Sequence, residues 1–83
     1  MGRPPALEVQ DVRRALTAHG FEHKRTRGSH EQWEGYVDGI RRVVTVDGND
    51  APFAARSRSL KSILRHSGIP KRGFYAAAGK PLP

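Results

Sequence analysis

The sequence predicts an α+β domain in the order helix, strand, strand, strand, helix. Two segments, residues 8–19 and 59–67, carry apolar residues at helical spacing. Between them lies a stretch with strand-forming residues and two turn signals. With 83 residues, the chain has the size of one domain with a thin core. The simplest way to bury both apolar stripes is to lay both helices on the same face of a three-stranded antiparallel sheet, which leaves the other face open to solvent.

The first helix is predicted over residues 8–19. Val9, Val12 and Leu16 are spaced at i, i+3 and i+7, so they share one face of a helix. Gly20 follows and can adopt the left-handed conformation that commonly ends helices.

Residues 21–46 are predicted to form the three strands. Gly28-Ser29 separates the first strand from the second, and Asp38-Gly39 is a strong hairpin signal between the second and the third. The third strand contains the β-branched run 43–46, which favours extended backbone.

The sequence predicts a structural role for two residues of the second strand. Trp33 lies an even number of positions from Val37, so the two share a face and Trp33 is predicted to belong to the core. Gly35 interrupts this strand and is expected to mark a β-bulge.

The second helix is predicted over residues 59–67 and follows a loop in which Phe53 is an apolar anchor. Its apolar stripe is formed by Leu60, Ile63 and Leu64. Ser57 or Ser59 is expected to cap its start, and Gly68 to end it. Residues 70–83 are expected to form a short turn and a tail, in which Phe74 and Tyr75 can pack on the domain and residues 76–83 do not. The predicted organisation is an arm at 1–6, a domain at 7–75 and a tail at 76–83.

The charge balance indicates a polyanionic partner. Fifteen Lys and Arg residues against eight Asp and Glu give a net charge of +7, and nucleic acid is the commonest partner of such a surface. The alternative is a set of solvated basic faces without a partner. The absence of cysteine excludes disulfides and thiolate zinc sites. No apolar run approaches the about 20 residues of a membrane span, and no secretory signal is present, so we expect a cytoplasmic protein.

The segment 24–30 is the strongest candidate for a functional site. Three basic side chains, Lys24, Arg25 and Arg27, precede the Gly28-Ser29 turn, whose backbone N–H groups and hydroxyl suit a phosphate. His30 follows and can exchange protons near neutral pH. Because RNA carries its own nucleophile, the 2′-hydroxyl, a histidine beside arginines would suffice to cleave it without a metal or other cofactor. On spacing alone, the alternative that His30 is an ordinary surface histidine stays open.

A metal site is not predicted. His19 and His23 are four residues apart, but Gly20 interrupts the helix that would align them, and no acidic cluster converges with another histidine in the sequence.

Four stretches together resemble the HicA family of mRNA interferase toxins. The resemblance covers about residues 7–75 and depends on the order and spacing of the motifs, because each motif alone is weak. The stretches are Leu16 through His19-Gly20-Phe21, then Arg25-Thr26-Arg27-Gly28-Ser29-His30-Glu31-Gln32-Trp33, then Arg41-Arg42-Val43-Val44-Thr45-Val46, and finally Leu60-Lys61-Ser62-Ile63-Leu64-Arg65-His66-Ser67-Gly68-Ile69.

The resemblance implies a fold like that of a double-stranded-RNA-binding domain. It further implies metal-independent cleavage of mRNA in which the Gly-Ser-His histidine, here His30, is essential, and a HicB-type antitoxin that covers the active site. Family members often have Pro-x-His after the third strand, where this chain has Asp47-Gly48-Asn49, so a second histidine is missing. The family also often has an apolar residue in the first strand at the position of His23.

We therefore expect an endoribonuclease toxin with His30 as general base or acid. Arg41 and Arg42 are expected to extend the RNA-binding surface of residues 24–29, although only one of the pair can face the RNA because strand side chains alternate. Two alternatives remain. One is a non-catalytic RNA-binding module of the same fold, and the other is an interaction protein whose basic face meets an acidic protein.

Overall fold

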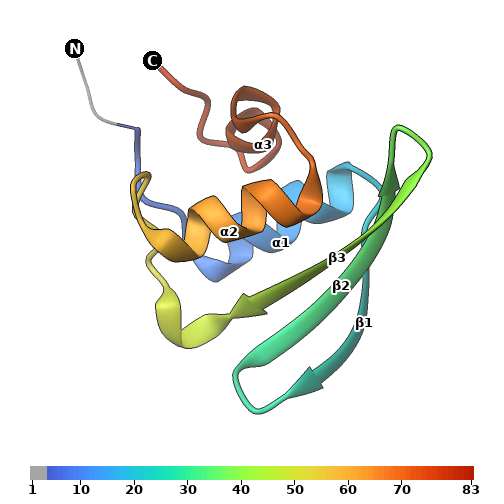
Figure 1. Cartoon of the computed structure of the whole chain (residues 1–83). Coiled ribbons are helices and arrows are strands. Elements are labelled where there is room, and N and C mark those ends of the chain that lie inside the picture. Colours follow the sequence, from blue (N-terminus) through green and yellow to red (C-terminus); the bar gives the residue numbers. More distant parts are fainter. Residues whose placement is uncertain (1–3) are drawn as a thin grey trace.

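The computed structural model describes residues 4–83, which fold into a three-stranded sheet and three helices (Figure 1). The first three residues of the expected N-terminal arm lie outside the described residues. The predicted fold class and the order helix, strand, strand, strand, helix are confirmed, with one further helix after them. The elements in chain order are α1 (Val9–Ala18), β1 (Glu22–Arg27), β2 (His30–Val37), β3 (Ile40–Asp47), the 3-10 turn η1 (Gly48–Asp50), α2 (Arg58–Ser67) and α3 (Lys71–Ala77).

Two tight hairpins build the antiparallel sheet in the order β1-β2-β3. Gly28 begins the first two-residue turn with a φ of 60°, a left-handed value that glycine adopts without strain. The second turn, Asp38-Gly39, has positive φ at both positions, 53° and 77°, as a type I′ turn requires. Both turns lie where the sequence predicts them.

All the helices lie on one side of the sheet, and the other face is open (Figure 1). α2 packs against β3, while α3 packs on α1. The covered face of the sheet contributes Trp33, Val44 and Val46 to the core, each at most 5% exposed. The predicted placement of two helices on one face and of Trp33 in the core is therefore confirmed.

The helix ends follow local sequence signals. The Ser57 hydroxyl accepts a hydrogen bond from the Leu60 N–H at 3.1 Å and so caps α2, as one of the two expected serines. Gly68 ends the helix in the left-handed conformation with a φ of 71°. Phe53 is fully buried and pairs through its backbone with Leu7, so it anchors the long loop before α2 as expected.

The expected bulge at Gly35 is wrong. Gly35 pairs with Arg42 in regular register, so β2 runs unbroken against β3. The reason for a glycine here is space, because an added Cβ would lie only 2.7 Å from the ring of Phe21.

A bulge occurs instead in β1. Its register against β2 shifts between His23 and Arg25, which leaves Lys24 as the extra residue. Beyond the bulge, Arg25 lies opposite Gln32 and Arg27 opposite His30.

The prediction of a short turn after residue 70 is wrong, because residues 71–77 form α3. Phe74 and Tyr75 are fully buried, as the sequence allowed, but Ala78, in the stretch expected to stay unpacked, is fully buried as well. The Arg14 guanidinium donates a hydrogen bond to the carbonyl of Ala78 at 2.8 Å. A seven-residue helix carries too little periodicity to be recognised from the sequence, although Pro70 suits the position just before it.

Within residues 4–83, no helix is both long enough and apolar enough to cross a membrane.

Candidate functional site

His30 begins β2 on the open face of the sheet. It lies opposite Arg27 of β1 and Asp47 of β3, so the two hairpins bring a basic and an acidic neighbour to its sides. Its side chain is 59% exposed, which leaves the imidazole accessible to a large substrate.

A hollow of about 360 Å³ adjoins His30 on this face, and we call it the basic groove. It contains two of the three basic residues predicted from β1, because the bulge at Lys24 turns Arg25 and Arg27 toward the same side as His30. The residues that line it are Arg25, Arg27, His30, Glu31, Gln32 and Thr45. Two guanidinium groups beside a histidine form an arrangement that can hold a phosphate and exchange a proton next to it.

Asp47 is the acidic neighbour of His30 and was not predicted as a site residue. Its Oδ2 lies 3.3 Å from Nε2 of His30. Its Oδ1 accepts hydrogen bonds from the Ser29 hydroxyl at 2.6 Å and from the Asn49 backbone N–H at 3.0 Å. These two donors lower the pKa of Asp47, so the carboxylate is charged at neutral pH. The pairing of His30 with Asp47 could have been predicted from the sequence, because counting outward from the Asp38-Gly39 turn puts residue 47 opposite residue 30.

Ser29 and Asn49 complete this network at the end of the sheet. The Asn49 side chain donates a hydrogen bond to the Ser29 hydroxyl at 3.0 Å, and the Gly48 N–H donates to the Ser29 carbonyl at 2.8 Å. The stretch that lacks the family's second histidine therefore still contacts the Gly-Ser-His turn, through an amide.

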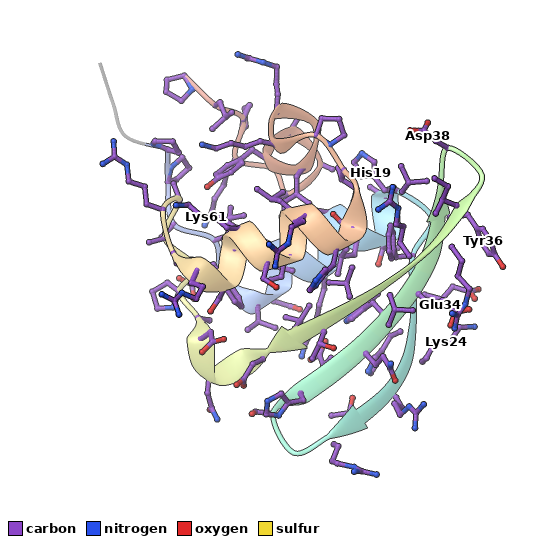
Figure 2. The ribbon with its side chains drawn as sticks, viewed as in Figure 1. His19, Lys24, Glu34, Tyr36, Asp38 and Lys61 are labelled. Atoms are coloured by element: carbon purple, nitrogen blue, oxygen red, sulfur yellow. The ribbon has the colours of Figure 1, made fainter. Side chains whose placement is uncertain are left out.

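The other predicted RNA-binding residues lie further away. Lys24 forms an ion pair with Glu22 at 3.0 Å. Arg41 is on the open face but forms an ion pair with Glu34 at 2.7 Å. Arg41 lies six positions before Asp47 on β3, which corresponds to about 20 Å along the strand. Figure 2 shows Glu34 and Tyr36 projecting from the sheet on the side away from the helices.

Arg42 lies on the covered face, as the alternation of a strand requires once Arg41 faces outward. Its guanidinium packs against Gly68 at the end of α2, within 3.0–3.2 Å of where a Cβ would be. The structure therefore brings only Arg25, Arg27, Gly28 and Ser29 of the predicted RNA-binding residues close to His30.

The remaining three histidines lie outside the basic groove. His19 contacts the Ala15 carbonyl at the end of α1, and His66 lies 3.4 Å from the Ser62 hydroxyl on α2. His23 stacks on Trp33 with ring centroids 5.2 Å apart. Among the described residues, no group of three or more His, Asp or Glu side chains is close enough to hold a metal ion.

A buried ion pair supports β2 from behind. Glu31, next to His30 but on the covered face, is 6% exposed and pairs with Arg13 of α1. The Trp33 indole N–H donates to the same carboxylate at 3.1 Å. The hydrogen bond from Arg13 lowers the pKa of Glu31 despite its burial. The contact fixes the start of β2 to α1 and so holds the backbone of His30.

Comparison with known proteins gives one match. The family model described as "HicA toxin of bacterial toxin-antitoxin" matches residues 9–69, which include α1, the whole sheet and α2. Searches of curated proteins and of solved structures returned no match. The matched segment spans well over half of the chain and contains the entire basic groove with His30 and Asp47. The chain therefore belongs to the HicA toxin family of bacterial toxin–antitoxin systems.

Proposed function

We propose that this toxin is an endoribonuclease that cleaves mRNA without a metal, with His30 as general base or acid. The observation that carries the proposal is the position of His30, which lies between the guanidinium groups of the basic groove and the carboxylate of Asp47 on an open sheet face. Membership of a toxin family supports a harmful activity, and the net charge of +7 supports a nucleic-acid substrate.

The chemistry requires few groups. Neutral His30 takes the proton of a ribose 2′-hydroxyl, and the 2′-oxygen attacks the adjacent phosphorus. The bond from phosphorus to the 5′-oxygen breaks, and that oxygen receives a proton from the imidazolium or from water. The products are a 2′,3′-cyclic phosphate and a 5′-hydroxyl. Arg25 and Arg27 bind the phosphate oxygens and stabilise the negative charge that grows on them.

Asp47 acts in this scheme as a positioning residue. With Nε2 of His30 directed at the carboxylate, Nδ1 is the nitrogen left to face the RNA. A charged carboxylate at this distance also stabilises the imidazolium that forms when His30 takes the proton.

The partner in this proposal is a HicB-type antitoxin that covers the basic groove in the cytoplasm. Such a cover needs acidic side chains opposite Arg25 and Arg27, because buried guanidinium groups without partners are costly. Complementary charge would also speed association in a salt-dependent way.

The decisive experiment compares His30→Ala with His66→Ala on a labelled RNA. His66 is an exposed histidine on α2, so its replacement controls for the loss of an imidazole outside the groove. We expect His30→Ala to reduce cleavage by about 10²–10⁴-fold while RNA binding persists. We expect His66→Ala and the addition of EDTA to leave cleavage unchanged.

Three outcomes would contradict the proposal in different ways. Cleavage by His30→Ala close to the wild-type rate would refute the role of the histidine. Strong inhibition by EDTA would indicate a metal-dependent mechanism. Salt-sensitive RNA binding with no cleavage by the wild type would favour the non-catalytic RNA-binding module.

A further inference from the structure

A second hollow adjoins His30 on the side opposite to the basic groove. It has a volume of about 350 Å³ and lies where η1 and the start of α2 meet the edge of β3; we call it the α2 hollow. Both hollows include His30 and Thr45, so a substrate that lies over His30 reaches both. The other residues that line the α2 hollow are Asp47, Asp50, Arg58, Ser59, Ser62 and Ile63.

The polar groups of the α2 hollow differ from those of the basic groove. Two carboxylates, Asp47 and Asp50, face it beside one guanidinium, that of Arg58, whereas the basic groove has two guanidinium groups. Two negative charges disfavour a phosphate here. The edge of a nucleobase, by contrast, presents both N–H donors and acceptors, which suit a carboxylate, a guanidinium and hydroxyl groups.

Asp50 is the carboxylate available to a ligand. In Asp47, Oδ1 already accepts the hydrogen bonds of Ser29 and Asn49, and Oδ2 lies 3.3 Å from Nε2 of His30. Asp50 accepts a hydrogen bond through Oδ2 from the Ser59 hydroxyl at 2.8 Å, and its Oδ1 makes no hydrogen bond to any described residue. The Ser59 contact joins η1 to α2 and fixes the carboxylate at the rim of the hollow.

We propose that the α2 hollow binds the base of a nucleotide next to the scissile phosphate and that Asp50 selects against uracil. This inference rests on the proposed ribonuclease function. A carboxylate only accepts hydrogen bonds, so it pairs with the exocyclic amino group of adenine, cytosine or guanine. Uracil has no amino group, and the carbonyl oxygens on both sides of its N–H would be repelled by Asp50.

Arg58 provides the second contact. Its guanidinium is exposed at the start of α2 and can stack on the face of a base or donate to its acceptors. Because a base must leave its stack to enter the hollow, the substrate at this point is single-stranded RNA, whose unpaired bases can be splayed out. The phosphate then lies over Arg25 and Arg27, and the base lies over Asp50 and Arg58.

The test uses short oligonucleotides with a single ribonucleotide linkage, all other sugars being 2′-deoxy. The base on each side of that linkage is varied in turn, and cleavage rates are compared between the wild type, Asp50→Asn and Arg58→Ala. Arg56→Ala is the matched control, because Arg56 is exposed just before α2 but does not line the hollow. Trp33 fluorescence checks that each variant is folded.

On one side of the cut, the wild type should cleave substrates with uracil about 5- to 150-fold more slowly than the others, the range expected for one base contact. Asp50→Asn should reduce this difference to within about threefold, because the new amide can also donate to a carbonyl. Arg58→Ala should slow cleavage for all bases at that position, and Arg56→Ala should match the wild type. An unchanged base preference in Asp50→Asn would overturn the inference.

A separate binding measurement keeps this inference distinct from the proposed function. The same oligonucleotides without the 2′-hydroxyl cannot be cleaved, and the dependence of their affinities on the varied base reports on the α2 hollow. If the wild type cleaves nothing but Asp50→Asn still removes a base-dependent affinity, the ribonuclease proposal fails and the base site stands. If cleavage occurs and neither rate nor affinity depends on the base, the base site is refuted and the ribonuclease stands.

Discussion

Removal of Arg13 should destabilise the domain measurably, because Arg13 is the cationic partner of a buried carboxylate. The Glu31 side chain is 8% exposed and that of Arg13 is 43% exposed. Breaking a fully buried pair costs about 3–5 kcal/mol and an exposed pair about 0–1 kcal/mol. Only the carboxylate is buried here, and the Trp33 indole still donates to it in the variant. We therefore expect Arg13→Ala to lower the free energy of unfolding by about 2 kcal/mol.

The assay is urea unfolding followed by fluorescence. Trp33 is the single tryptophan of the chain and donates to Glu31, so its signal comes from the network that is perturbed. Thr17→Ala, on the exposed side of α1, controls for the helix propensity that alanine adds. A loss below about 0.5 kcal/mol relative to that control would refute the reasoning, since surface substitutions commonly fall within this range.

The pH dependence gives an independent check through Glu31→Gln. The pKa of Glu31 is lowered in the folded protein from its ordinary value of 4.5. The stability that its charge contributes is therefore fully present above pH 4.5 and is lost as the pH falls through the folded pKa. The difference in unfolding free energy between the wild type and Glu31→Gln should be constant near neutral pH and shrink below pH 4.5. A difference that stays constant down to pH 3 would show that the charge contributes nothing.

Two further predictions concern RNA. With roughly four phosphates bound, the slope of log affinity against log salt should be about −3. A fourfold rise in salt then weakens RNA binding roughly 50-fold. Arg27→Ala should make the slope less steep by the amount that about one phosphate contact contributes. A salt-independent affinity would show that the basic groove does not hold phosphates. Asp47→Asn should lower kcat about tenfold or more at an unchanged KM, because it removes the charge beside His30 but not the phosphate contacts. Asp38→Asn, at the distant turn, is the control, and equal kcat values for the two variants would exclude a positioning role for Asp47.

The sequence predicted those elements that local signals specify. The first helix and both hairpins could be predicted from the sequence, because they depend on signals between neighbouring residues. These signals are the apolar stripe of Val9, Val12 and Leu16 and the two turn sequences. α3 could not, because its burial depends on α1, through contacts such as that of Arg14 with Ala78. The same holds for Gly35, whose role depends on the ring of Phe21 from another element.

The candidate site divides in the same way. His30 follows from the turn before it, and its pairing with Asp47 follows from the register of the second hairpin. The membership of Arg58 and Asp50 in a hollow beside His30 depends on how α2 packs on β3, which no local pattern specifies.

The bulge at Lys24 decides on which face the basic groove forms. His23 lies opposite Trp33 and stacks on it, so its side chain belongs to the covered face. In a strand without a bulge, every second residue shares a face, and Arg25 and Arg27 would follow His23 toward α1. There they would meet the pair of Arg13 and Glu31, where further positive charge has no carboxylate to accept it. The extra residue reverses the alternation, so His23 keeps its stack on Trp33 while both guanidinium groups turn to the open face beside His30.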